Sequence, residues 1–120
     1  MKPVPETEFD VSVERVAGTA IVHVCGELDI ATTPTLRAVL EGLDGACDRV
    51  ILDLSTLRFM DSTGIRLAVT EHQRATADGF DFVIAGAEGN VMKILRLTGL
   101  DVVLPLAPDV ASALSESSVD

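Results

Sequence analysis

The sequence has few aromatic residues, few bases and no long apolar run. Its 120 residues include four Phe, no Tyr and no Trp, so we expect a core of aliphatic side chains. Nine Lys and Arg stand against 19 Asp and Glu, which gives a formal net charge of −10. A surface this acidic repels phosphate backbones and anionic lipids, and it has few aromatic side chains for base stacking. The composition therefore predicts that neither nucleic acid nor membrane is a partner.

The two cysteines, Cys25 and Cys47, occur without a C-x-x-C motif and without a Cys/His cluster. Structural zinc sites are built from such clusters, so we expect neither a metal nor a cofactor. A disulfide between the two is one alternative, and two buried thiols are the favoured one. Residues 1–7 hold two prolines and no apolar segment of a secretory signal. They are expected to form a flexible leader of a cytoplasmic protein.

The hydrophobic pattern predicts one α/β domain over residues 8–114, followed by a polar tail over 115–120. Apolar alternation on both sides of Ala17-Gly18 predicts a β-hairpin at the N-terminal end. Further strands are expected at 49–54, 80–85 and 102–104, and helices at 33–43, 63–77, 91–98 and 110–114. Strands that alternate with helices indicate a mostly parallel sheet with right-handed crossovers. The hairpin would add one antiparallel strand.

Two helices carry specific expectations. Thr33 precedes Pro34 and is predicted to be the N-cap of the first helix, which Gly45 would end. In the second helix, one face is expected to hold Ile65, Ala68, Val69 and His72, because they follow one another at i, i+3, i+4 and i+7.

The common catalytic patterns are missing from the sequence. Neither G-x-x-x-x-G-K-[ST] nor G-x-G-x-x-G occurs, and Ser62 is not part of G-x-S-x-G. His72 follows Ser62 by ten residues on one predicted helix, which places it about 15 Å away by helical rise. His23 alternates with apolar residues, which favours a hydrogen-bonded sheet histidine over a catalytic one. We therefore expect no enzymatic activity.

The acids near the strand ends allow two interpretations. Glu27, Asp29 and Asp61 can meet at one end of the sheet, where they could in principle serve an acid/base or metal site. Solvated loop acids and helix caps are the favoured interpretation, because such a site would need further partners that the sequence does not supply.

The segment Asp61-Ser62-Thr63-Gly64 lies where a predicted strand ends and a helix begins. The free N–H groups of a helix start receive a phosphate readily, so Ser62 could be modified with little disturbance of the fold. A phosphate would add about −1.5 to −2 charges beside Asp61. A simple helix cap is the alternative, and this segment alone favours the cap.

Three blocks of sequence resemble one protein family. Residues 50–64, VILDLSTLRFMDSTG, resemble the signature of STAS-domain anti-sigma factor antagonists. Residues 26–29, GELD, are similar to that family's loop after its second strand, and residues 94–100, ILRLTGL, to the end of its third helix. The resemblance covers most of residues 8–112. It implies a STAS-like fold, with a mixed, mostly parallel β-sheet, an N-terminal hairpin and about four helices.

The resemblance also implies a mechanism called partner switching. In this family the unphosphorylated antagonist binds an anti-sigma factor, which frees the sigma factor. The anti-sigma factor is also a serine kinase with a histidine-kinase-like ATPase fold, and its phosphorylation of the antagonist ends the interaction. A PP2C-type phosphatase restores the active form. The alternative is a STAS interaction or scaffold module that does not switch, in a signalling or transport complex.

By the same resemblance, Ser62 is the phosphoacceptor, and Thr63 is the less favoured one. The implied partner surface surrounds Ser62 and consists of Gly26, Glu27, Asp29, Thr32, Thr33, Asp61, Thr63, Gly64, Ile65 and Arg66. Two positions depart from the family. Arg66 stands where relatives often have a second glycine, and Arg96-Leu97 where they often carry an aromatic–acidic pair. These departures leave the cognate partner open, and an exposed helix arginine is the favoured interpretation of Arg66.

Overall fold

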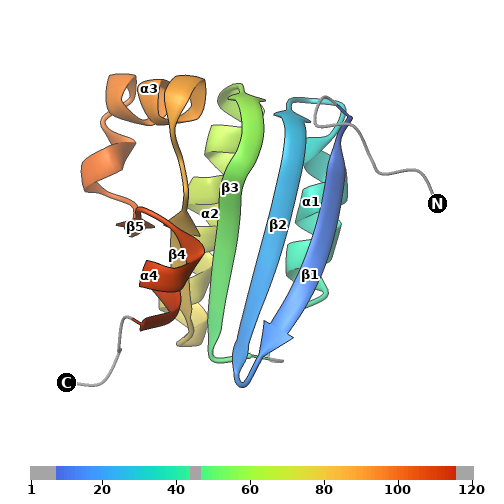
Figure 1. Ribbon diagram of the computed structural model, residues 1–120, viewed down its shortest axis with the longest axis vertical. Helices are drawn as coiled ribbons and strands as arrows, with labels where there is room; N and C mark the ends of the chain where they lie inside the picture. Colours follow the sequence, from blue (N-terminus) through green and yellow to red (C-terminus); the bar gives the residue numbers. More distant parts are fainter. Residues whose placement is uncertain (1–7, 44–46, 116–120) are drawn as a thin grey trace.

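The computed structural model describes residues 8–43 and 47–115, which form a five-stranded sheet with helices on both faces. The strands lie in the order β1-β2-β3-β4-β5 (Figure 1). Their bounds are β1 Asp10–Val16, β2 Thr19–Leu28, β3 Arg49–Met60, β4 Asp81–Ala85 and β5 Leu106–Ala107. β1 pairs with β2 antiparallel, and all other pairs are parallel. The predicted mixed sheet with an N-terminal hairpin is confirmed. The leader at 1–7, Gly45 and most of the expected tail lie outside the described residues.

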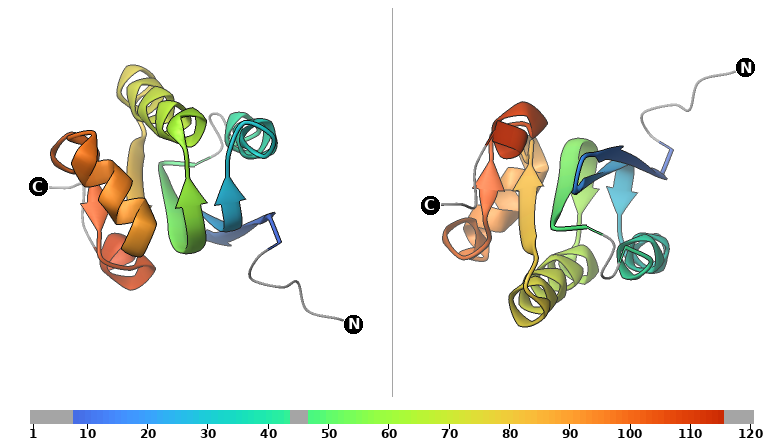
Figure 2. Two further views of the ribbon diagram at one scale, coloured as in Figure 1. Left: turned by 90° about the horizontal axis from the view of Figure 1, so that it is seen from above. Right: turned by 90° about the horizontal axis from the view of Figure 1, so that it is seen from below.

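The helices are divided between the two faces of the sheet. Their bounds are α1 Thr33–Glu41, α2 Ser62–Asp78, α3 Gly89–Leu97 and α4 Val110–Ser115, with a 3-10 turn η1 at Leu100–Val102. α1 and α2 cover one face, and α4 covers part of the other (Figure 2). α3 lies beside the end of the sheet at which β3 finishes (Figure 1). Among the helices in the described ranges, none is long and apolar enough to cross a membrane.

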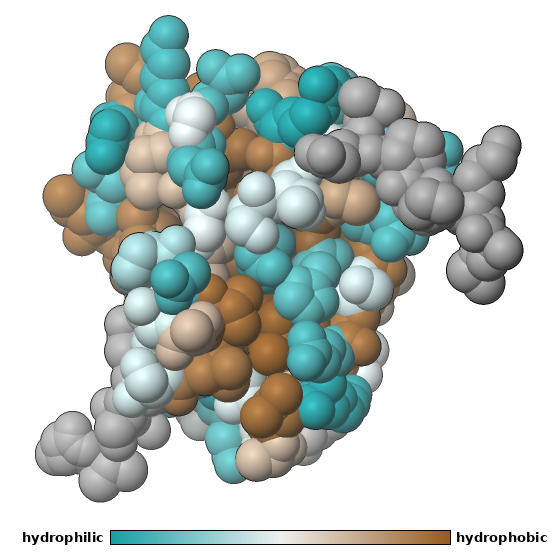
Figure 3. Space-filling model, viewed as in Figure 1, coloured by the Kyte–Doolittle hydropathy of each residue, from teal (hydrophilic) through white to brown (hydrophobic). Residues whose placement is uncertain are grey.

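The core is aliphatic, as the composition predicts. The larger cluster lies between the sheet and helices α1 to α3, with Val22 and Val24 of β2 at its centre. Ile21, which precedes Val22 in the sequence, points to the opposite face and joins a smaller cluster with Ile51 of β3 and Ala113 of α4. Figure 3 shows that second face, where hydrophobic side chains gather beside α4 and hydrophilic ones cover β1. β2 is therefore an interior strand with both faces buried.

The strand expected at 102–104 is wrong. Val102 is 84% exposed, and the chain there forms η1 and a turn in which the N–H groups of Val103 and Leu104 donate to the Leu100 carbonyl. Pairing with β4 begins only at Pro105, whose carbonyl accepts from Ile84 N at 2.9 Å. The local hydrogen bonds that follow the end of α3 use the backbone groups that a strand would need.

The prediction of which side of α2 packs on the sheet is also partly wrong. Ala68 is buried, but Ile65, Val69 and His72 are only partly so. The face that packs on the sheet holds Gly64, Leu67, Ala68, Glu71 and Ala75. A buried carboxylate was not foreseen, because an apolar pattern does not reveal a charge whose partner is one turn away.

The burial of Glu71 is compensated by an ion pair. Arg74 Nη2 lies 2.6 Å from Glu71 Oε2 and also donates to the Leu40 carbonyl at 3.2 Å. A buried charge is tolerated when it is paired and hydrogen-bonded in this way. The pair therefore fastens α2 to the end of α1.

Three smaller expectations need correction. The N-cap of α1 is Thr32 and not Thr33, because the Thr33 N–H already donates to the Asp29 carbonyl. The helix ends at Glu41, and Gly42 is its C-cap. The two cysteines are thiols, as favoured, but both are partly exposed rather than buried.

Candidate functional site

The carboxyl ends of β2 and β3 lie side by side and carry the predicted site (Figure 1). Leu28 pairs with Met60 at the last position of the two strands. The Asp61 N–H donates to the Leu28 carbonyl at 3.1 Å, which ties the start of α2 to β2. Both strands run further than the sequence pattern predicted, and the segment 26–29, expected as a loop, is strand as far as Leu28.

The bend near Gly26 explains how β2 reaches this edge. The register with β3 shifts between Gly26 and Glu27, and Gly26 has a φ of +94°. A Cβ on Gly26 would lie 2.7 Å from the Cα of Phe9, so a side chain has no room there. Glycine is suited to both conditions. Gly26 is therefore a buried residue that supports the end of β2, and Glu27, which follows it, is exposed.

Asp61 caps helix α2 and determines where Ser62 is presented. Its Oδ1 accepts from Thr63 N at 2.9 Å, from Gly64 N at 3.4 Å and from the Thr63 hydroxyl. The Thr63 hydroxyl and the two backbone N–H groups hold the pKa of Asp61 below its usual range, with burial as a smaller opposing effect. The carboxylate is therefore charged at neutral pH. Ser62 follows as the first residue of the helix and is exposed.

The turn between β2 and α1 is closed by Asp29 and Thr32. Asp29 Oδ1 accepts from Ala31 N at 2.9 Å and from Thr32 N at 3.0 Å. The Thr32 hydroxyl donates to the Glu27 carbonyl at 2.9 Å and accepts from Asp29 N at the same distance. These bonds hold Ile30 at the tip of the turn, where its side chain is 77% exposed.

The starts of the two helices are linked to each other. The hydroxyls of Thr33 and Thr63 lie 3.3 Å apart, which joins α1 to α2 beside Ser62. Gly64 packs directly on the strand ends, since a Cβ there would lie 2.7 Å from Met60 Cγ and 2.9 Å from Leu28 Cδ2. The turn at 29–32 and the first turn of α2 therefore form one continuous edge, which we call the Ser62 edge.

The predicted site residues thus divide by exposure. Gly26, Thr33 and Gly64 are buried and support the edge. Ser62, Glu27 and Arg66 are exposed, and the partly exposed members are Asp29, Thr32, Asp61, Thr63 and Ile65. The structure brings both groups together, and their role in partner binding stays a prediction.

Two exposed apolar residues near this edge were missed by sequence reasoning. Ile30 is the one large apolar residue of the turn at 29–32, and Phe59, next to Met60, is 44% exposed. In the sequence, each is a large apolar residue with polar neighbours. Such a residue can be buried or exposed, depending on what packs over it. Their exposure makes the Ser62 edge suitable for protein contact.

The geometry does not supply a base for Ser62. His23 is a hydrogen-bonded sheet histidine, as expected, with Nδ1 2.7 Å from Asp53 Oδ2 and Nε2 3.0 Å from Glu14 Oε1. His72 lies on α2 ten residues after Ser62. Within residues 8–43 and 47–115, no group of three or more His, Cys, Asp or Glu side chains is arranged to hold a metal ion.

Comparisons with known proteins agree with this fold. Residues 10–113 match the family model of the STAS domain. An anti-sigma F factor antagonist of Paenibacillus polymyxa is 26% identical over 113 residues, which span 92% of this chain and 97% of the relative. An anti-sigma-B factor antagonist of Staphylococcus aureus is 33% identical over 81 residues, or 66% of this chain and 74% of the relative.

Solved structures of similar proteins have the same architecture. An anti-sigma factor antagonist from Mycobacterium paratuberculosis superposes with a TM-score of 0.82 at 25% identity, covering 92% of this chain and 95% of its own. The antagonist SpoIIAA in its unphosphorylated form gives a TM-score of 0.74 at 24% identity, covering 88% and 93%. Bacillus SpoIIAA in its phosphorylated form gives 0.67 at 22% identity, covering 89% and 96%. The chain thus belongs to the STAS-domain family of anti-sigma factor antagonists.

Proposed function

We propose that this chain acts by partner switching through Ser62. The unphosphorylated form binds an anti-sigma factor that is also a serine kinase with a histidine-kinase-like ATPase fold, and the sigma factor is released. Phosphorylation of Ser62 ends the binding, and a PP2C-type phosphatase reverses it. The observation that carries the proposal is the exposed hydroxyl of Ser62 on a helix start that Asp61 already holds in place. These partners control transcription, so the proposed location is the cytoplasm.

The transfer needs little from the chain itself. The Ser62 oxygen attacks the γ-phosphorus of ATP, an O–P bond forms, and the bond from that phosphorus to the ADP oxygen breaks. The serine proton passes to a base of the kinase. In the reverse reaction, water displaces the serine oxygen at phosphorus and releases inorganic phosphate. The chain is thus a substrate and a ligand in this scheme, and not an enzyme.

Ser62 is a better acceptor than Thr63. The Thr63 hydroxyl is partly buried and contacts both the Asp61 carboxylate and the Thr33 hydroxyl. Its modification would break the cap of α2 and the link to α1. Ser62 is exposed, and the cap is formed by Asp61 with the N–H groups of Thr63 and Gly64, so a phosphate on Ser62 does not require these bonds to break.

A phosphate on Ser62 would oppose docking by charge. It adds about −1.5 to −2 charges directly beside the ionised Asp61. A partner that fits the unmodified edge would have to remove water from this phosphate, which lies beside the acidic Asp61. A penalty of roughly 3 kcal/mol lowers affinity by more than 100-fold.

The test is to incubate the purified chain with each anti-sigma factor kinase of its genome and ATP, and to map phosphate by mass spectrometry. We expect phosphate on Ser62 in the wild type and none in Ser62→Ala. Thr63→Ser, which keeps a hydroxyl at position 63, should still be modified at Ser62. Absence of phosphate on Ser62 with every such kinase contradicts the proposal and favours a scaffold module that does not switch.

A further inference from the structure

A groove between β3 and α3 begins next to the Ser62 edge. It has a volume of about 330 Å³ and is lined by Phe59, Met60, Asn90, Lys93, Ile94 and Leu97. Met60 precedes Ser62 by two residues, so the groove continues the surface that presents the phosphoacceptor. A partner seated on Ser62 would therefore reach this groove without a break in the contact.

The groove exposes large apolar side chains. Leu97 is 73% exposed, and Phe59 is 44% exposed on the facing strand. Leu97 belongs to the last turn of α3, whose buried side chains Val91 and Leu95 already anchor the helix on the core. The exposure of Leu97 is thus not needed for folding. Apolar side chains that form a concave surface are suited to receive an apolar side chain of another molecule.

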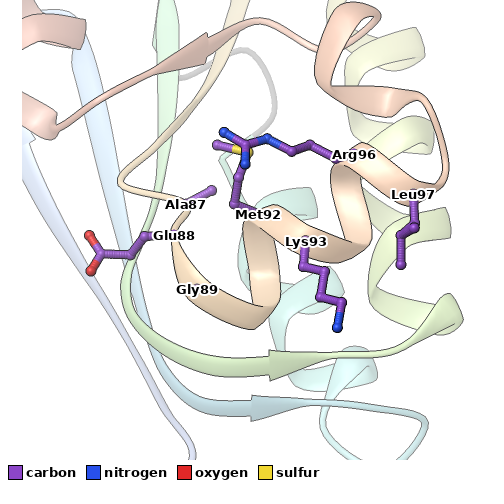
Figure 4. Close-up of a pocket in the computed structure, with 7 residues that line it drawn as sticks. All are labelled: Ala87, Glu88, Gly89, Met92, Lys93, Arg96 and Leu97. Carbon is purple, nitrogen blue, oxygen red and sulfur yellow. The ribbon is translucent and has the colours of Figure 1, made fainter.

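The charge at the groove is opposite to that of the whole chain. Lys93 lines the groove, and Lys93 and Arg96 both line a second hollow of α3. In Figure 4, Lys93 and Arg96 project from α3 in different directions, and Glu88 points away from both. On a chain with a net charge of −10, these bases make α3 locally attractive to carboxylates.

We propose that this groove is a second contact region for the anti-sigma factor kinase, which places an apolar side chain between Phe59 and Leu97 and a carboxylate at Lys93. The inference rests on the proposed function and adds the chemistry of the partner segment, an amphipathic acidic one. A second copy of this chain fits less well, because two molecules of −10 repel each other. The groove adds affinity that does not depend on the phosphorylation state of Ser62, and it contributes to the choice among related kinases.

The experiment measures the affinity of the full chain for the kinase that phosphorylates Ser62, by calorimetry at two salt concentrations. We expect Leu97→Ala and Lys93→Gln each to weaken binding by about five- to tenfold. Lys93→Gln should also reduce the salt dependence. Both residues are exposed, so the melting temperature of each variant should match the wild type.

Two exposed residues of β1 provide matched controls. Val16→Ala removes an apolar side chain that is 40% exposed, and Arg15→Gln removes an exposed base. Both lie near the β1–β2 turn, at the opposite end of the sheet from α3 (Figure 1). Each control should bind the kinase within about twofold of the wild type.

The outcomes separate this inference from the proposed function. Groove variants that bind like the controls, while Ser62→Asp still abolishes binding, overturn the groove and leave switching intact. A wild type that binds no kinase overturns both. A homodimer that Leu97→Ala dissociates, seen by analytical ultracentrifugation, assigns the groove to a second copy and overturns the inference.

Discussion

The carboxylate of Asp61 performs two tasks for its neighbour Ser62. It accepts hydrogen bonds from Thr63 and Gly64, so the first turn of α2 is formed before any partner binds. It also places a negative charge next to the serine oxygen. Under the proposed switch, a phosphate at Ser62 would leave this turn in place but would lie beside a like charge, which disfavours docking by repulsion.

Replacement of Asp61 by alanine should destabilise the protein. The variant loses the side-chain acceptor at the N-cap, and such losses cost about 0.5–2 kcal/mol. Urea denaturation followed by circular dichroism would show a lower midpoint with an unchanged slope. Asp61→Asn keeps an acceptor oxygen, so its urea midpoint should lie between those of the wild type and Asp61→Ala. An alanine variant as stable as the wild type would show that the cap contributes nothing.

The same residues show how far sequence reasoning extends. A helix cap at Asp61-Ser62-Thr63 with an exposed Ser62 hydroxyl could be predicted from the local sequence, whereas the choice of Ser62 as phosphoacceptor rested on the family resemblance. Ile30 could not, since its exposure depends on the turn that Asp29 and Thr32 close. Exposure of an apolar side chain is a property of the tertiary structure.

The first turn of α2 depends on how closely it approaches the strand ends. Gly64 faces Met60 and Leu28 at distances that leave no space for a methyl group. The helix can therefore begin directly at the sheet edge, and Ser62 stands beside the turn at 29–32. This contact joins β2, β3 and α2 into one unit.

Gly64→Ala should lower stability although alanine is the better helix former. Overpacking against Met60 and Leu28 costs about 1–3 kcal/mol, which outweighs a propensity gain of about 1 kcal/mol. Thermal denaturation should show a reduced melting temperature. Gly42→Ala is the matched control, since its Cβ would come no closer than 3.4 Å to its nearest neighbours and its φ is −70°. If both variants melt alike, the close approach at Gly64 is not limiting.

At the level of elements, the alternation of strands and helices was predictable from periodicity. Two elements differ from the prediction, and in both of them local hydrogen bonds or polar contacts, rather than apolar periodicity, determine the structure. Residues 102–104 are held in a turn by bonds to the Leu100 carbonyl. Glu71 is buried beside Arg74, which donates to its carboxyl group, while burial and the charges of Glu41 and Asp78 raise its pKa to about 7. The buried face of α2 therefore differs from the purely apolar one.

Across the whole sheet, His23 couples three strands. Its ring lies between Glu14 of β1 and Asp53 of β3, on the face of β2 opposite to that of its neighbours Val22 and Val24. Burial lowers the pKa of His23, but the hydrogen bonds and charges of the two carboxylates outweigh this effect and raise it above 6.5. A protonated ring donates to both carboxylates at once, so the imidazolium form fastens β1 to the sheet.

This coupling predicts a pH dependence of stability. Because the folded pKa of His23 is raised, its contribution is complete below pH 6.5 and is lost as the pH rises through the folded pKa. The free energy of unfolding should therefore decline over that range, and the decline should be smaller in His23→Gln. An equal slope in His23→Gln and in the wild type would contradict the coupling.

The net charge of −10 has a smaller effect at Ser62 than its magnitude suggests. Charges further than about 8 Å from Ser62 are screened at physiological salt. The acids that would act in the proposed switch are therefore the nearby ones, chiefly Asp61. The same screening allows α3 to be locally basic at Lys93 and Arg96 on an acidic molecule. Composition predicts a net charge but not its distribution, and the fold is needed to see that bases gather on α3.

The most direct test of the account is the affinity of the anti-sigma factor kinase for the chain before and after phosphorylation at Ser62. Isothermal titration of purified proteins, with a nonhydrolysable nucleotide, would measure both forms. We predict a loss of more than 100-fold on phosphorylation, which is roughly 3 kcal/mol. Ser62→Ala should bind like the unmodified protein, and Ser62→Asp like the phosphorylated one. Equal affinity of the phosphorylated and unphosphorylated forms would contradict the account.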